Sequence, residues 1–204
     1  RFGDWTERAV AAIDPSGDDG LDLTELRLAD EPEWFLMLIS ASADFDLSDE
    51  NDLVLLLDTD DDPGTGLQTE GLGAELRFVF GARSGRYYPE STTDPFDGIE
   101  LNHLPLSLQG APTVTSTRFE IALARDATIN GNQLFLEGQS AIVLRSGTGD
   151  RLPDLGTITY QLDQKSPPPP DDSALEREQP EDLRLVSWNV RFDSPWENAE
   201  ANRF

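Results

Sequence analysis

Cysteine is absent from this sequence, which excludes disulfide bonds, zinc–thiolate sites and thiol catalysis. Histidine and methionine occur once each, and the sequence contains neither a Gly-x-Ser-x-Gly motif nor a glycine-rich phosphate loop. The longest apolar run, residues 34–39, is much shorter than the roughly 20 residues that span a bilayer. We therefore expect no membrane span, and no complete catalytic constellation within residues 1–163.

Basic residues are scarce as well. Lys and Arg together number 15 against 40 Asp and Glu, which gives a formal net charge of -25. Because this field would repel a phosphate backbone, we expect no direct binding to nucleic acid. The acidity leaves three interpretations open: several sites for hard cations, a salt-adapted surface, or simple solubility.

The sequence does contain enough apolar material for one substantial core, with 37% hydrophobic residues that include ten Phe and four Trp. Apolar and polar residues alternate with the period of a β-strand, most clearly at residues 117–123. Residues 34–39 and 53–57 are apolar on both faces, which is typical of central strands buried on two sides. Only residues 5–13 have a helical pattern. The sequence predicts an all-β fold, namely an antiparallel β-sandwich of jelly-roll or immunoglobulin-like topology, with a barrel as the alternative.

The pattern changes sharply near residue 163. Residues 1–163 are expected to form the β-sandwich, and residues 164–182 a charged linker whose four consecutive prolines favour an extended polyproline conformation. A new strand begins in residues 183–204, and its partner strands are not expected within this chain. The chain starts at Arg1 rather than Met, so we expect the natural N-terminus to lie upstream.

Acidic residues are densest directly after the second of the two apolar runs. Asp58, Asp60 and Asp62 alternate along a turn that is rich in Gly and Pro, so their carboxylates can converge on one Ca²⁺ ion. The turn is not an EF-hand, because Pro63 replaces the invariant glycine and Thr69 replaces the twelfth-position glutamate. The alternative is a solvated acidic turn that ends the strand, with Asp58 capping the turn.

A second acidic loop contains Asp14, Asp18 and Asp22 with looser spacing. It is the weaker candidate metal site: it could complete the first site, hold another ion, or be an ordinary polar loop. Candidate ligand-binding aromatics are Trp5, Tyr87 and Tyr88, because exposed rings stack on sugar faces. The two tyrosines are adjacent in a strand, so only one of them is expected to face the core.

Several short stretches together resemble the family-9 carbohydrate-binding-module-like, or DOMON-like, β-sandwiches. The stretches are Asp4 with Trp5, residues 22–26 (DLTEL), 33–38 (EWFLML) and 57–60 (LDTD), Thr65 with Gly66, and residues 73–78 (GAELRF). This resemblance implies an antiparallel β-sandwich that often holds structural calcium and sometimes binds sugars or haem. It also implies a secreted, periplasmic or cell-surface location.

The C-terminal stretch has a resemblance of its own. Residues 183–190 (LRLVSWNV), followed by Asn202, Arg203 and Phe204, look like the start of an endonuclease/exonuclease/phosphatase-fold domain. The resemblance implies that Asn189 lies beside a catalytic divalent metal such as Mg²⁺, whose other ligands would belong to a part of that domain that this chain lacks. The alternative is an ordinary β-strand that contains a Trp.

These observations predict a non-catalytic accessory or ligand-binding module, stabilised by Ca²⁺ and attached to a secreted metal-dependent phosphoesterase or nuclease. One alternative is a carbohydrate-binding module, for which the partner is a sugar or another small ligand. A further alternative is a structural spacer or adhesion module that needs no ligand. The oligomeric state is not predicted.

Overall fold

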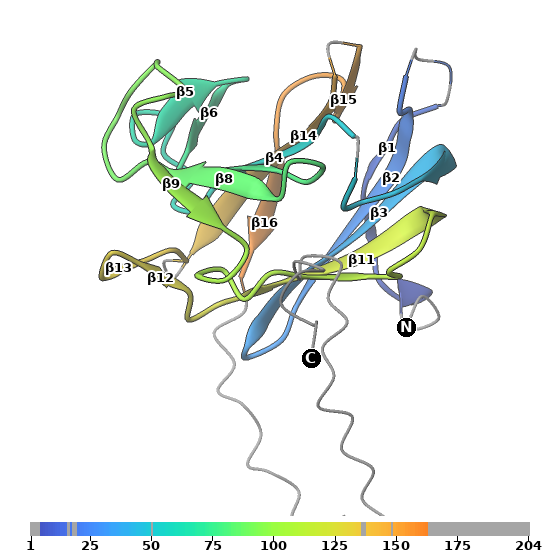
Figure 1. Ribbon diagram of the computed structural model, residues 1–204, viewed down its shortest axis with the longest axis horizontal. Coiled ribbons are helices and arrows are strands. Elements are labelled where there is room, and N and C mark those ends of the chain that lie inside the picture. Colours follow the sequence, from blue (N-terminus) through green and yellow to red (C-terminus); the bar gives the residue numbers. More distant parts are fainter. Residues whose placement is uncertain are drawn as a thin grey trace, which may run out of the picture.

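Two antiparallel β-sheets pack against each other in the computed structural model (Figure 1). The structure describes residues 5–162, apart from residues 16, 18, 19, 50, 136, 137 and 148. The predicted linker (residues 164–182) and the strand that contains Asn189 (residues 183–204) therefore lie outside the described residues, as does the boundary expected near residue 163.

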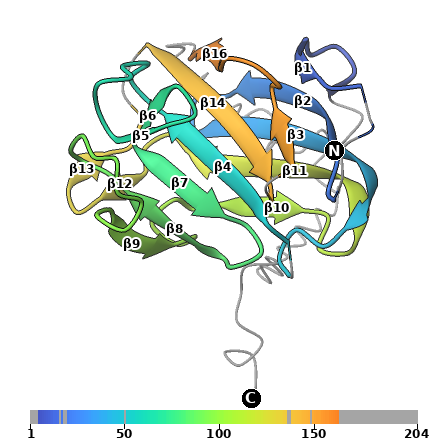
Figure 2. The same cartoon turned by 90° about the horizontal axis from the view of Figure 1, so that it is seen from above.

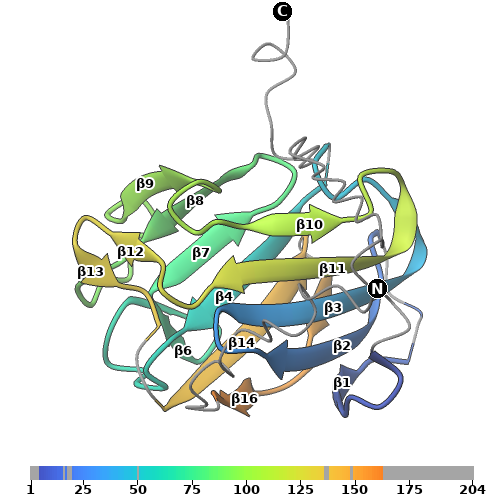
Figure 3. The same cartoon turned by 90° about the horizontal axis from the view of Figure 1, so that it is seen from below.

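One sheet has five strands. Their order across the sheet is β1 (Val10–Ile13), β2 (Leu23–Asp30), β3 (Trp34–Phe45), β11 (Ser116–Ala124) and β10 (Gln109–Ala111). Figure 3 shows this sheet in front of the other. Its central strand β3 contains the apolar run 34–39 and is buried on both faces there. On the outer face Leu38 packs against Trp5, and on the inner face Phe35 and Met37 enter the core.

The other sheet has seven strands and faces the viewer in Figure 2. Their order is β15 (Asp150–Leu152), β14 (Gln139–Ser146), β4 (Leu53–Asp58), β7 (Leu76–Val79), β8 (Ser84–Tyr87) and β9 (Ile99–Asn102), and β16 (Ile158–Gln161) also pairs with β14. Two short hairpins lie outside these sheets, β5 (Leu67–Thr69) with β6 (Leu72–Ala74) and β12 (Thr128–Ile129) with β13 (Asn132–Gln133).

The prediction of an all-β antiparallel fold is confirmed, since every pairing between named strands is antiparallel. The two runs predicted as central strands are β3 and β4, each with a partner on both sides. The jelly-roll or immunoglobulin-like topology stays a prediction.

The helical pattern at residues 5–13 was misleading. Val10–Ile13 form β1, which pairs with β2 in the register Val10↔Arg27 and Ile13↔Glu25, and its side chains alternate between half-buried and exposed. A pattern this short fits both periods, and the β-branched Val10 and Ile13 favour the extended form once an open edge of β2 is available.

The outer face of β4 is covered by the β5–β6 hairpin. Leu56 on β4 joins Leu72 and Ala74 of the hairpin, and Ala141 and Val143 of β14, in one buried cluster. This cover explains why both faces of β4 are apolar. It also fixes the position of the acidic turn, because that turn runs from the end of β4 into the hairpin.

Among the described residues, we find no helix of the length and hydrophobicity that crossing a membrane would require.

Candidate metal centre

The acidic turn after β4 meets a third carboxylate from the start of β7. Asp58 is the last residue of β4, Asp60 lies in the turn, and Glu75 lies between β6 and β7. The pairing of Leu57 with Leu76 across β4 and β7 sets Glu75 beside the end of β4. One carboxylate oxygen from each of Asp58, Asp60 and Glu75 lies within 4.8 Å of the others, and this is the group of described residues that could hold a metal ion.

Asp58 is the most deeply buried member of this group, with 1% of its surface exposed. Its Oδ2 accepts a hydrogen bond from the Gly73 amide at 3.1 Å. Its Oδ1 is buried and has no hydrogen-bond partner. A buried carboxylate oxygen without a donor is costly, whereas a bound cation would satisfy it directly. This atom is the clearest sign of a ligand at the site.

Glu75 is held by two threonines. The Thr59 amide and hydroxyl donate to Oε2 at 2.8 and 3.3 Å. The Thr65 hydroxyl lies 3.0 Å from Glu75 Oε1, 3.1 Å from Asp60 Oδ1 and 2.9 Å from the Asp62 carbonyl oxygen. A hydroxyl has only one proton to donate, so it cannot serve these three acceptors at once. The site therefore has more acceptors than protons.

The electrostatics of the site favour a cation. Burial is the main reason why the pKa of Glu75 is raised to about 7. The charges of Asp60 and Asp58 act in the same direction, and the hydrogen bonds from Thr59 and Thr65 oppose them. Burial also raises the pKa of Asp58, and the adjacent charge of Asp60 acts in the same direction. No ion pair within the described part of the chain includes any of these three carboxylates. Oxygen ligands with this much uncompensated negative charge suit a hard cation.

Two glycines allow the turn to pack directly onto the β5–β6 hairpin. A Cβ atom at Gly73 would lie 2.3 Å from the Asp62 carbonyl oxygen and 2.5 Å from that of Thr65, so no other residue fits without movement of the backbone. Gly66 has a φ of +52°, a left-handed conformation that favours glycine. The same close approach brings the Gly73 amide within reach of Asp58.

The structure brings together two of the three carboxylates that the sequence predicted for this site. Asp62 is exposed, and its Oδ1 accepts a hydrogen bond from the Gly64 amide at 2.8 Å instead of joining Asp58 and Asp60. Glu75 completes the group, and sequence reasoning missed it. The only local signal was a charged residue placed between the apolar residues Ala74 and Leu76, within the stretch 73–78 that contributes to the resemblance.

The second acidic loop lies elsewhere. Asp14 and Asp22 are both buried, at the two ends of the connection between β1 and β2 in the five-stranded sheet. Neither belongs to the group around Asp58, so these two residues do not complete the first site. Asp18 lies outside the described residues.

The candidate ligand-binding aromatics are largely buried. Tyr87 faces the core and is 5% exposed. Tyr88 directly follows β8 and is not part of the main core cluster, but it is only 1% exposed. Its ring packs beneath Gly98, and its hydroxyl donates to the Pro95 carbonyl. The expectation that one of the two tyrosines faces the core is correct. The other is covered by a loop, so neither ring is available for stacking in this conformation.

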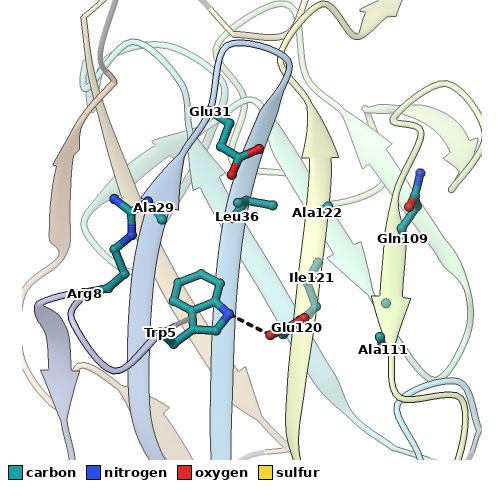
Figure 4. Close-up of a pocket in the computed structure, with 11 residues that line it drawn as sticks. Trp5, Arg8, Ala29, Glu31, Leu36, Gln109, Ala111, Glu120, Ile121 and Ala122 are labelled. Atoms are coloured by element: carbon teal, nitrogen blue, oxygen red, sulfur yellow. Dashed lines mark hydrogen bonds between the residues drawn. The ribbon is translucent and has the colours of Figure 1, made fainter. Parts of the chain in front are cut away.

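Trp5 lies on the outer face of the five-stranded sheet, beside a groove of about 330 Å³ (Figure 4). It is 6% exposed, packs on Ala29 and Leu38, and donates from Nε1 to Glu120 Oε1 at 2.8 Å. Arg8, Glu31, Gln109 and Glu120 supply polar groups around the same groove.

Searches against family models, curated proteins and solved structures gave no significant match to this chain. The resemblances to carbohydrate-binding-module-like sandwiches and to phosphatase-fold enzymes therefore stay predictions.

Proposed function

We propose that residues 1–163 form a calcium-stabilised accessory module, without catalytic activity of its own, in a larger secreted metal-dependent phosphoesterase or nuclease. The observation that carries the calcium part is the buried Asp58 Oδ1, which has no hydrogen-bond partner and lies in a group with Asp60 and Glu75. The attachment to an enzyme is supported by the C-terminal resemblance around Asn189.

Calcium suits this site better than magnesium. Ca²⁺ accepts about six to eight oxygen ligands in flexible geometry, whereas Mg²⁺ demands near-octahedral geometry and keeps its waters. The site offers two buried carboxylates, one exposed carboxylate and the backbone carbonyls of a tight turn, which is an irregular donor set. The exposed side at Asp60 leaves room for water to complete the coordination of a Ca²⁺ ion.

Thermal melting in calcium and in chelator, at matched ionic strength, tests this proposal. At a free Ca²⁺ concentration a hundredfold above Kd, the ion should stabilise the fold by ~2.7 kcal/mol. For a domain of this size, that should raise the melting midpoint by roughly 5–10 °C. Asp58→Asn keeps the shape of the side chain but removes the charge, and it should abolish most of the difference between the two conditions.

The matched control for this experiment is Asp61→Asn. Asp61 is exposed in the same turn and lies outside the metal-binding group, and its φ of +54° is one that Asn adopts readily. This variant loses the same charge, so it should keep the calcium response of the wild type. Identical melting curves of the wild type in calcium and in chelator would refute calcium binding and leave the turn as a solvated loop.

A second candidate function, carbohydrate binding, is favoured by the groove beside Trp5. The groove is lined by charged and amide side chains that can form hydrogen bonds to the hydroxyl groups of a sugar, although the Trp5 ring itself is only 6% exposed. Gln109→Ala should weaken binding of neutral oligosaccharides, measured by Trp fluorescence, whereas Gln133→Ala on the remote hairpin β12–β13 should not. If no oligosaccharide in a broad panel changes the fluorescence, a structural spacer or adhesion module becomes the better description.

A further inference from the structure

Buried carboxylates occur at two places in the described part of the chain. Asp58 and Glu75 belong to the site after β4. The remaining three are Asp14, Asp22 and Asp150, which are 5%, 6% and 3% exposed. Burial of a carboxylate disfavours its charged form unless donors or a cation compensate. The second group therefore requires an explanation of its own.

Asp22 carries the strongest sign of a ligand. It precedes β2, and its Oδ2 accepts a hydrogen bond from the Gly17 amide at 3.0 Å. Its Oδ1 is buried and has no hydrogen-bond partner. Within the described residues no Lys or Arg forms an ion pair with Asp22. The orphaned oxygen has the same character as Asp58 Oδ1 at the first site.

Asp150 reaches this place from the other sheet. It is the first residue of β15, which pairs with β14 at the edge of the seven-stranded sheet and also contacts β2. Its Oδ2 accepts a hydrogen bond from the Leu23 amide, the peptide group that directly follows Asp22. A buried carboxylate from the other sheet therefore contacts the peptide group that joins Asp22 to Leu23.

Asp14 approaches the same segment along the neighbouring strand. It directly follows β1, and its amide donates to the Thr24 carbonyl oxygen at 3.0 Å, which sets it opposite a residue two positions from Asp22. Three residues with buried carboxylates thus lie around one corner of the sandwich, where β1, β2 and β15 come together. Their carboxylate oxygens do not all lie within 4.8 Å of one another, so binding of one ion requires them to move closer together.

We propose that Asp14, Asp22 and Asp150 bind a second hard divalent cation, calcium by preference, that joins the edge of the five-stranded sheet to β15. Carboxylate oxygens are the ligands that such an ion prefers, and backbone carbonyls and water can complete its shell. The ion satisfies Asp22 Oδ1 and offsets the negative charge gathered at this corner. This inference is independent of the site at Asp58, since the two groups share no residue.

Counting bound ions tests the proposal. The purified 204-residue chain, titrated with Ca²⁺ by calorimetry and weighed by native mass spectrometry, should bind two ions. Asp22→Asn should bind one and keep the ion at Asp58, whereas Asp58→Asn should bind one and keep the ion at Asp22. Asp154→Asn, an exposed residue just after β15, loses the same charge and should still bind two.

The two sites can fail separately in this experiment. If Asp22→Asn loses an ion while Asp58→Asn keeps both, the second site stands and the first is refuted. If Asp22→Asn keeps the full number of ions, or if the wild type binds one ion that Asp58→Asn removes, the second site is refuted.

Should Asp22→Asn fail to fold, Asp150→Asn replaces it, because its amide oxygen can still accept from the Leu23 amide. Asp150→Asn should bind one ion, and a count of two in this variant refutes the proposal. Hydrogen exchange supplies a second measurement in the wild type. Chelation should speed exchange of the Leu23 amide by about tenfold or more, since the ion holds its acceptor in place. An exchange rate that is the same in calcium and in chelator refutes the link between the sheets.

Discussion

Glu75 should make the stability of the metal-free protein fall as the pH rises. Its pKa is raised from 4.5 in the unfolded chain to about 7 in the folded protein. For a group whose pKa is raised on folding, the favourable contribution is complete below the unfolded pKa and is lost as the pH rises through the folded pKa. The window is therefore about pH 4.5 to somewhat above 7. Across this whole window the folded protein should lose about 3 kcal/mol of unfolding free energy, which is the value that corresponds to the difference between the two pKa values.

Urea denaturation in the presence of a chelator, at pH 5 and pH 8 and constant ionic strength, measures this loss. The wild type should lose about 2.5 kcal/mol of unfolding free energy more than Glu75→Gln between the two pH values, because the amide does not titrate. The raised pKa of Asp58 acts in the same direction in both proteins. Calcium should reverse the trend in the wild type, since the ion binds the deprotonated site and competes with protons.

The large net charge of the chain also weakens the fold as carboxylates ionise, so a control is needed. Asp61→Asn removes the same charge from an exposed position of the same turn, and it should keep the pH dependence of the wild type. Glu75→Gln should lose that dependence. If Glu75→Gln and the wild type show the same change in unfolding free energy with pH, Glu75 does not have a raised pKa, and the electrostatic reasoning about the site is wrong.

Further expectations concern the ion, the turn and the C-terminal strand. Asp60→Ala should remove most of the difference in melting midpoint between calcium and chelator. In the wild type, magnesium should raise the melting midpoint above its value in chelator much less than calcium does. A rise as large as that in calcium would contradict the irregular donor geometry of this site. Gly73→Ala should destabilise the fold by about 1–3 kcal/mol in urea denaturation, because its Cβ would meet the Asp62 carbonyl oxygen at 2.3 Å, and an unchanged stability would show that the turn can move. The 204-residue chain should hydrolyse no generic phosphodiester, because Asn189 alone cannot assemble a metal and a general base. Turnover that Asn189→Ala abolishes would overturn this last expectation.

The fold class was predictable because it depends on local periodicity. The runs that became β3 and β4 are apolar at every position, and such runs belong in the middle of a covered sheet. The N-terminal segment was not predictable in the same way. Val10–Ile13 are too few to separate the helical from the extended period, and the open edge of β2 decided their conformation.

The candidate site was predictable only where its ligands are close in sequence. Asp58 and Asp60 are two residues apart, so alternation along a turn was enough to bring them together. Glu75 reaches them through the pairing of β4 with β7, which no spacing rule reveals. Asp150 is an even clearer case, because its partner on β2 belongs to the other sheet and lies 127 residues away in the sequence. Ligands contributed by strand pairing stay hidden until the register is known.

The long separation between Leu23 and Asp150 also has a kinetic consequence. Contacts between distant segments require a large loop to close first, so the corner where β15 meets β2 is expected to form late in folding. Interactions that are absent from the transition state slow unfolding and leave the folding rate nearly unchanged. An ion bound at this corner would slow unfolding and so lengthen the lifetime of the native state. In the presence of a protease, that lifetime matters more than the equilibrium stability whenever cleavage is faster than reclosing.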